Sequence, residues 1–111
     1  MSNQRVLVVD DDEKIRFTMQ RILTAEGLDV STASDGAEGL IVFEQVRPDL
    51  VLLDVSMPRL NGFEVCERLK GDAETRLVPV VIVTSGADLD NRVRGIDAGA
   101  DDFLSNPFER V

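Results

Sequence analysis

The chain has 111 residues, of which 43% are hydrophobic, and this length and composition are typical of one folded domain with one core. Its formal charge of -9, with no histidine, is unfavourable for binding a nucleic-acid backbone. Cys66 is the only cysteine, so no internal disulfide can form, and neither a signal-peptide pattern nor a long apolar span is present. We therefore expect a cytoplasmic domain that contacts neither nucleic acid nor a membrane.

The first half of the chain alternates between strand and helix patterns. An apolar run over residues 5–9 predicts a buried strand, and the amphipathic spacing after it predicts a helix that ends at Gly27. Residues 28–33 predict an edge strand, and Ser34 or Asp35 can cap a second helix that ends before Pro48. The residues expected on the buried faces of these two helices are Ile15, Met19, Ile22 and Leu23, then Ala37, Leu40, Ile41, Phe43 and Val46.

The second half continues this alternation without a repeat, a linker or a second domain. The apolar run before Asp54 predicts a third buried strand, residues 80–83 after Pro79 predict a fourth, and residues 102–105 predict a short fifth. Two helices are expected between these strands, the second of them ending at Gly99. Their expected buried faces contain Phe63, Val65, Cys66 and Leu69 in the first, and Leu89, Val93 and Ile96 in the second.

Alternating strands and helices predict an α/β domain, with a parallel sheet between helices and right-handed crossovers. In the flavodoxin-like strand order 2-1-3-4-5, the first and third strands are neighbours and ligands bind at their carboxyl ends. Asp10, Asp11 and Asp54 would then lie close together. Taken separately, Asp54 also suits a turn and the acids after residue 9 also suit a solvated loop. Their convergence favours a functional site.

Carboxylates held within several ångströms raise one another's pKa and destabilise the fold unless a cation compensates. Mg²⁺ fits best, because it binds a few carboxylates and keeps several waters. A carboxylate beside such an ion can also attack phosphorus and form an acyl phosphate. Thr84, at the next strand end, could donate a hydrogen bond to a phosphoryl oxygen, although strand propensity alone also explains a threonine there. The absence of histidine excludes Ser/His and Cys/His hydrolases, and neither a P-loop nor a dinucleotide-binding fingerprint is present.

Four groups of motifs follow one another along essentially the whole chain. They are Leu7-Val8-Val9-Asp10-Asp11-Asp12, then Leu52-Leu53-Asp54 with Met57-Pro58 and Asn61-Gly62, then Val83-Thr84-Ser85, and finally Gly99-Ala100-Asp101-Asp102-Phe103-Leu104. Each is a weak signal alone, but the set resembles the receiver domain of bacterial two-component response regulators. The resemblance implies a flavodoxin-like (CheY-like) fold, which is a doubly wound parallel sheet of five strands in the order 2-1-3-4-5.

The resemblance also implies the chemistry of the acidic residues. Asp54 would accept a phosphoryl group from a sensor histidine kinase or a phosphotransfer protein in a Mg²⁺-dependent reaction. Asp11 would bind Mg²⁺ directly, Asp10 would bind it largely through water, and Ser56 would offer its backbone carbonyl as a further ligand. The domain would therefore be a phosphoprotein of a phosphorelay pathway.

A conformational switch is implied by residues on the later strands. Thr84 would be the hydroxyl that moves toward the phosphoryl group, Phe103 the aromatic residue that swings inward behind it, and Ser85 the small residue that keeps the site open. The change would control an output domain in the same protein or a separate partner. Asn106 stands where the family has lysine, so a cation is replaced by an uncharged amide. Natural divergence, an engineered substitution and signalling without phosphate each explain this residue.

Two other functions use the same residues. A Mg²⁺-dependent aspartyl-phosphate phosphatase also needs these acids, but Ser56 stands two residues after Asp54, where such an enzyme has a second acid. A phosphate-independent adaptor is favoured only by Asn106. We therefore expect a signalling domain rather than an enzyme, with chemistry limited to self-phosphorylation and autodephosphorylation.

The chain ends at Val111, where the fifth helix of a receiver would begin. We therefore expect a receiver domain over residues 1–111 that is truncated before or within its last helix. The first and fifth helices should together cover one face of the sheet, so the missing helix should leave an apolar patch. We expect self-association, as a homodimer or by exchange of elements, to cover that patch.

Overall fold

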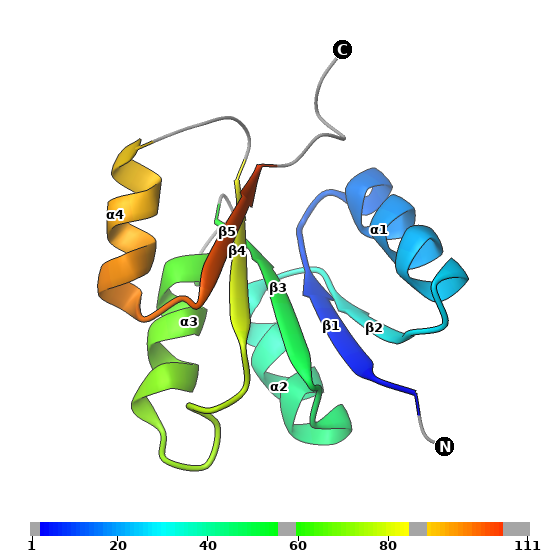
Figure 1. Ribbon diagram of the computed structural model, residues 1–111, viewed down its shortest axis with the longest axis horizontal. Coiled ribbons are helices and arrows are strands. Elements are labelled where there is room, and N and C mark those ends of the chain that lie inside the picture. The colour runs from blue at the N-terminus through cyan, green and yellow to red at the C-terminus, as the bar shows by residue number, and fades with distance from the viewer. Residues whose placement is uncertain (1–2, 56–59, 85–88, 106–111) are drawn as a thin grey trace.

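A computed structural model describes residues 3–55, 60–84 and 89–105. These residues form a five-stranded sheet and four helices (Figure 1). The elements are β1 (Arg5–Val9), α1 (Glu13–Ala25), β2 (Asp29–Ala33), α2 (Gly36–Val46), β3 (Leu50–Asp54), α3 (Gly62–Gly71), β4 (Val80–Thr84), α4 (Leu89–Ala98) and β5 (Asp102–Ser105). All strand pairs are parallel and the order is β2-β1-β3-β4-β5, so the predicted topology is confirmed.

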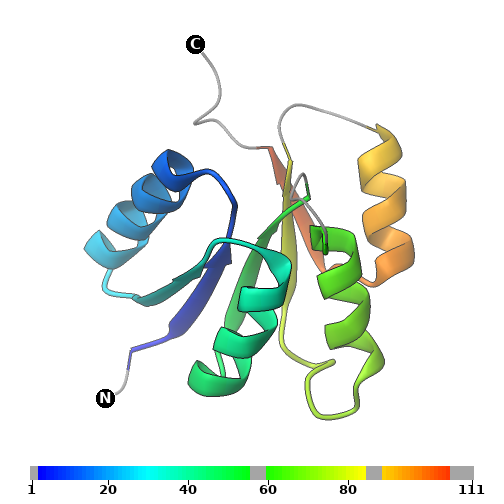
Figure 2. The ribbon, with the colours of Figure 1, turned by 180° about the vertical axis from the view of Figure 1, so that it is seen from behind.

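Each face of the sheet has its own hydrophobic core, because successive strand residues point to opposite faces. Figures 1 and 2 show α1 on one face and α2, α3 and α4 on the other. The buried core under α1 contains Val6, Val8, Ile15, Met19, Leu52 and Val83. The core on the other face includes Leu7, Val9, Phe43, Val51, Leu53, Phe63, Val65, Cys66, Leu69, Val80 and Ile82. Strands β1 and β3 are therefore buried on both faces, as their continuous apolar runs predict.

Several predicted helix boundaries are confirmed by local geometry. Asp35 caps α2 by accepting a hydrogen bond from a backbone N–H at 2.8 Å. Gly27 and Gly99 follow α1 and α4 with φ of 87° and 92°, a left-handed conformation that favours glycine. Two further caps were not predicted, Asp12 at the start of α1 and the capping box of Asn61 at the start of α3.

The predicted buried faces are correct for α3 and partly wrong for the other helices. Four apolar residues expected inside have large exposed fractions, namely Ile22 at 46%, Ile41 at 60%, Val93 at 49% and Ile96 at 65%; Ala37 is also exposed. The helices α2 and α4 instead bury glycines, and a Cβ on Gly39 would lie only 3.0 Å from the side chain of Val9. A helix that approaches the sheet through glycine turns its larger apolar residues outward, and hydrophobic periodicity cannot reveal such a face.

Lys70 connects α3 to the amino ends of β4 and β5. Its Nζ donates hydrogen bonds to the carbonyl oxygens of Arg76 at 3.0 Å and Val78 at 2.9 Å, and lies 2.6 Å from Asp101 Oδ2. The same Asp101 oxygen accepts a hydrogen bond from the Val80 backbone N–H at 2.8 Å. Only 15% of the Lys70 side chain is exposed, whereas 47% of the Asp101 side chain is, so solvent is excluded from the lysine but still reaches the carboxylate.

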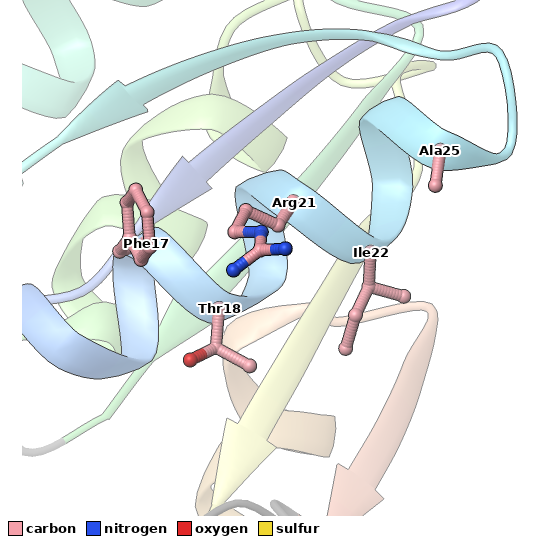
Figure 3. Close-up of a pocket in the computed structure, with 5 residues that line it drawn as sticks. All are labelled: Phe17, Thr18, Arg21, Ile22 and Ala25. Atoms are coloured by element: carbon pink, nitrogen blue, oxygen red, sulfur yellow. The ribbon is translucent and has the colours of Figure 1, made fainter.

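An open apolar groove runs along the outer surface of α1 (Figure 3). Its volume is about 330 Å³, and its lining residues are Phe17, Thr18, Arg21, Ile22 and Ala25. Phe17 is 57% exposed, and the Arg21 guanidinium carbon lies 5.8 Å from the centroid of its ring. Apolar surface is therefore exposed on α1, while the predicted self-association stays a prediction. Among the described residues, no helix has the length and apolar content needed to cross a bilayer.

Candidate metal-binding and phosphoacceptor site

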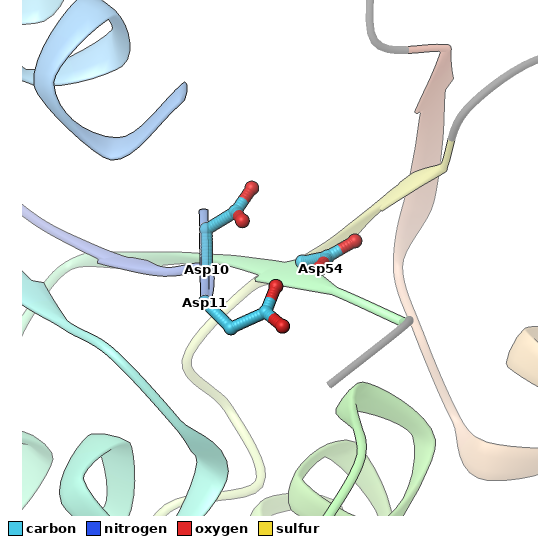
Figure 4. Close-up of side chains that lie close together, drawn as sticks. All are labelled: Asp10, Asp11 and Asp54. Atoms are coloured by element: carbon cyan, nitrogen blue, oxygen red, sulfur yellow. The ribbon is translucent and has the colours of Figure 1, made fainter. Parts of the chain in front are cut away.

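The carboxyl ends of β1 and β3 bring three acidic side chains together. The two strands are paired in parallel with Val9 opposite Leu53, so Asp10 and Asp54 follow the same step of the ladder. One carboxylate oxygen from each of Asp10, Asp11 and Asp54 lies within 4.8 Å of the other two (Figure 4). The predicted convergence is therefore observed, while the role of each residue remains a prediction.

The three carboxylates differ in their exposure to solvent. Asp10 is buried with 3% exposure, Asp54 is half-buried and Asp11 is exposed. The Asp10 carboxylate accepts a hydrogen bond from the Asp12 backbone N–H at 2.9 Å, which offsets part of the cost of burying its charge. Arg16 Nη1 also donates to the Asp10 backbone carbonyl at 2.8 Å. The site thus has one wall fixed by the protein and one side open to solvent.

The first residue of α3 supports the backbone of Asp54. A Cβ on Gly62 would lie far inside van der Waals contact with the Asp54 carbonyl oxygen. The helix start can approach the strand end this closely only because the residue is glycine. The cap of Asn61 holds the same turn, with its side chain accepting from the Glu64 N–H at 3.0 Å. The end of β3 is therefore fixed by α3 as well as by the sheet.

This donor set fits Mg²⁺. All three groups are hard carboxylate oxygens, and histidine and thiol ligands, which softer metals prefer, do not take part. Asp11 is exposed and Asp54 is half-buried, so water reaches both residues. A carboxylate in this position can bind a cation and also act as a nucleophile.

Of the other predicted site residues, the structure describes Thr84 and Phe103. Thr84 is the last residue of β4, where its backbone pairs with Ser105, and β4 is the neighbour of β3. Phe103 lies on β5, half-buried, with its ring against α4 at Gly95. The predicted roles of Ser56, Ser85 and Asn106 fall on residues that lie outside the described part of the chain.

Two contacts near the site were missed by the sequence reasoning. Arg16 holds the Asp10 carbonyl, and its only signal was a position one helical turn after Asp12. Gly95 contacts the Phe103 ring, and a glycine inside an amphipathic helix gave no signal at all.

A family model for the response regulator receiver domain matches residues 6–111. The chain belongs to the response regulator receiver family. This receiver domain is 45% identical over 104 residues to response regulator MprA of Mycobacterium tuberculosis, covering 94% of the chain and 44% of MprA. The chain therefore spans less than half the length of the curated relatives it matches.

Solved structures agree with this assignment. A response regulator from Chloroflexus aurantiacus gives a TM-score of 0.92 at 30% identity, covering 97% of this chain and 88% of that one. The chemotaxis protein CheY4 of Vibrio cholerae gives 0.90 at 31% identity, covering 96% and 89%. Receiver domains are phosphorylation-controlled signalling domains rather than metabolic enzymes, and this chain is one of them.

Proposed function

We propose that this receiver domain accepts a phosphoryl group on Asp54 from a sensor histidine kinase or a phosphotransfer protein. A carboxylate oxygen of Asp54 forms the new bond to phosphorus. The P–N bond of the donor phosphohistidine breaks, and its electron pair stays on the imidazole nitrogen. The observation that supports this proposal is the convergence of Asp54 with Asp10 and Asp11 within 4.8 Å, at an open end of the sheet.

Each of the three acidic residues would have its own role in binding the cation. The exposed Asp11 and the half-buried Asp54 would hold the cation, and the buried Asp10, which accepts a hydrogen bond from the N–H of Asp12, would bind it largely through water. The Ser56 backbone carbonyl would be a further ligand in this proposal. Bound there, Mg²⁺ would neutralise charge on the transferring phosphoryl group.

The phosphorylated state differs from the free state by about 1.5 to 2 negative charges at Asp54. Thr84 responds through its hydroxyl and Phe103 through the position of its ring, and the change controls an output domain or a partner protein. Asn106 supplies a hydrogen-bonding amide without a charge, so coupling between phosphate and switch is weaker than with lysine. The buried free thiol of Cys66 is compatible with the reducing cytoplasm that we propose as the location.

Incubation with Mg²⁺ and acetyl phosphate tests the proposal directly. We expect a stoichiometric adduct by intact mass, mapped to Asp54 and absent from Asp54→Asn. Asp29→Asn is the matched control, because it removes an exposed carboxylate on β2 outside the cluster. Turnover of phosphate esters without an adduct would instead indicate the phosphatase. An unmodified mass in Mg²⁺ would indicate the phosphate-independent adaptor that Asn106 favours.

A further inference from the structure

The ring of Phe103 packs directly against the backbone of α4. A Cβ built on Gly95 would lie far inside van der Waals contact with the ring carbons Cε1 and Cζ. Gly95 is buried and Phe103 is half-buried, so moving the ring away would uncover apolar surface that now packs on the helix. Any side chain at position 95 would therefore force the ring or the helix to move.

The arrangement of β5 directs this ring toward α4. Phe103 pairs with Ile82 in the interior of the β4–β5 ladder, and its neighbour Leu104, which points to the other face, is 51% exposed. The outer side of α4 carries Val93 and Ile96 instead of burying them. The helix α4 is therefore rotated about its own axis so that Gly95 faces the ring.

We propose that Gly95 is a positioning residue, which couples the position of the Phe103 ring to the position of α4. The space that the ring occupies exists only because position 95 has no side chain. When the ring leaves, α4 loses a packing partner at a buried point, so its contact with β5 must change. Phosphorylation would shift α4 through this contact, and that second half of the proposal rests on the proposed function.

A double-mutant cycle tests the contact without any phosphorylation. Alanine inside a helix normally favours folding by about two- to fivefold over glycine, so Gly95→Ala should do this when the ring is removed by Phe103→Ala. With the ring present, we expect Gly95→Ala to lower the folding equilibrium constant instead. Gly71→Ala is the control, because a Cβ there meets nothing within 4 Å, and its effect should be equal in both backgrounds. An equal effect of Gly95→Ala in both backgrounds would overturn the proposal.

Fluorine NMR tests the link to phosphorylation in the same 111-residue chain. The chain contains 5 phenylalanines, so fluorophenylalanine labelling gives few signals, and the one absent from Phe103→Ala is assigned to Phe103. With Mg²⁺ and acetyl phosphate, this signal should shift in the wild type and in Gly71→Ala, but not in Gly95→Ala, although all three carry the adduct. A wild-type shift in Gly95→Ala would refute the link. If the wild type forms no adduct, the proposed function fails, and the double-mutant cycle still decides the contact.

Discussion

Replacing Asp11 by asparagine should stabilise the metal-free domain and remove most of the stabilisation that Mg²⁺ provides. Asp11 is the best position for this test because it is exposed, and the described part of the structure contains no hydrogen bond to its carboxylate. The substitution keeps the size of the side chain and removes one charge from the cluster. The first effect follows from the cluster geometry, and the second rests on the proposed Mg²⁺ site.

The magnitude follows from the separation of the carboxylates. Asp11 lies within 4.8 Å of both Asp10 and Asp54, and two unit charges at that distance repel by about 1 kcal/mol in a water-like dielectric and by about 3.5 kcal/mol at an effective value of 20. The lower figure applies to an exposed group, so losing two repulsions should stabilise the domain by about 2 kcal/mol. For a chain of this size, that corresponds to a rise in Tm of roughly 8 °C.

Thermal unfolding at low salt, with chelator and then with excess Mg²⁺, measures both effects. In chelator, Asp11→Asn should have a higher melting temperature than the wild type. Mg²⁺ at about a hundred times its Kd should stabilise the wild type by about 2.7 kcal/mol and the variant by much less, so the order of the two melting temperatures should reverse. About 1 M salt should shrink the difference in chelator, because it screens the repulsion.

The matched control is Asp29→Asn, which removes an exposed carboxylate outside the cluster. It should have little effect in chelator and should keep the full response to Mg²⁺. Equal melting temperatures of Asp11→Asn and Asp29→Asn in chelator, together with a full Mg²⁺ response of Asp11→Asn, would contradict both the repulsion and the metal site.

Three further predictions concern other parts of the domain. Lys70→Met should cost about 2 kcal/mol in urea unfolding, because two carbonyl hydrogen bonds and the Asp101 ion pair are lost. Burial raises the pKa of Asp101, but Lys70 and the Val80 N–H lower it more, so this stabilisation should be present above about pH 4 and fall away below it. Burial raises the pKa of the Cys66 thiol to about 11, so a chromogenic disulfide reagent at neutral pH should react only as fast as the domain unfolds. Asn106→Lys should increase the phosphorylation-dependent fluorine shift severalfold by restoring a cation.

Each of these predictions has its own control. Lys14→Met removes an exposed lysine and should leave unfolding unchanged, and a Lys70→Met penalty that stays constant below pH 4 would contradict the role of Asp101. Labelling of Cys66 that is faster than unfolding would mean that α3 opens locally. Asn106→Gln keeps the amide, so a response equal to that of Asn106→Lys would show that charge is unimportant there.

The sequence allowed the strands and the position of the site to be predicted, because both depend on local patterns. The apolar run before Asp54 predicted a buried strand, and topology rules then placed its carboxyl end beside Asp10. These rules could not predict the directions in which the acidic side chains point. Burial of Asp10 and exposure of Asp11 depend on how the loop after β1 turns and on the hydrogen bond from Arg16.

The buried faces of the helices were predicted least well, and the cause is the same in α2 and α4. Periodicity correctly placed Phe43 of α2 inside, but it gives no weight to Gly39 and Gly95, through which α2 and α4 also approach their neighbours. Ile41 and Ile96 consequently point outward. The face of α3 was predicted correctly because Phe63 and the apolar residues after it do make its core contacts.

The Lys70 network makes the two ends of β4 and β5 different. Lys70, Asp101 and Val80 fasten both strands where they begin, whereas the acidic cluster and the last residue of β4 lie at the opposite edge. The two ends of these strands are therefore held differently: side-chain contacts from Lys70 and Asp101 reinforce the ladder where the strands begin, and the acidic cluster lies near the edge where they end.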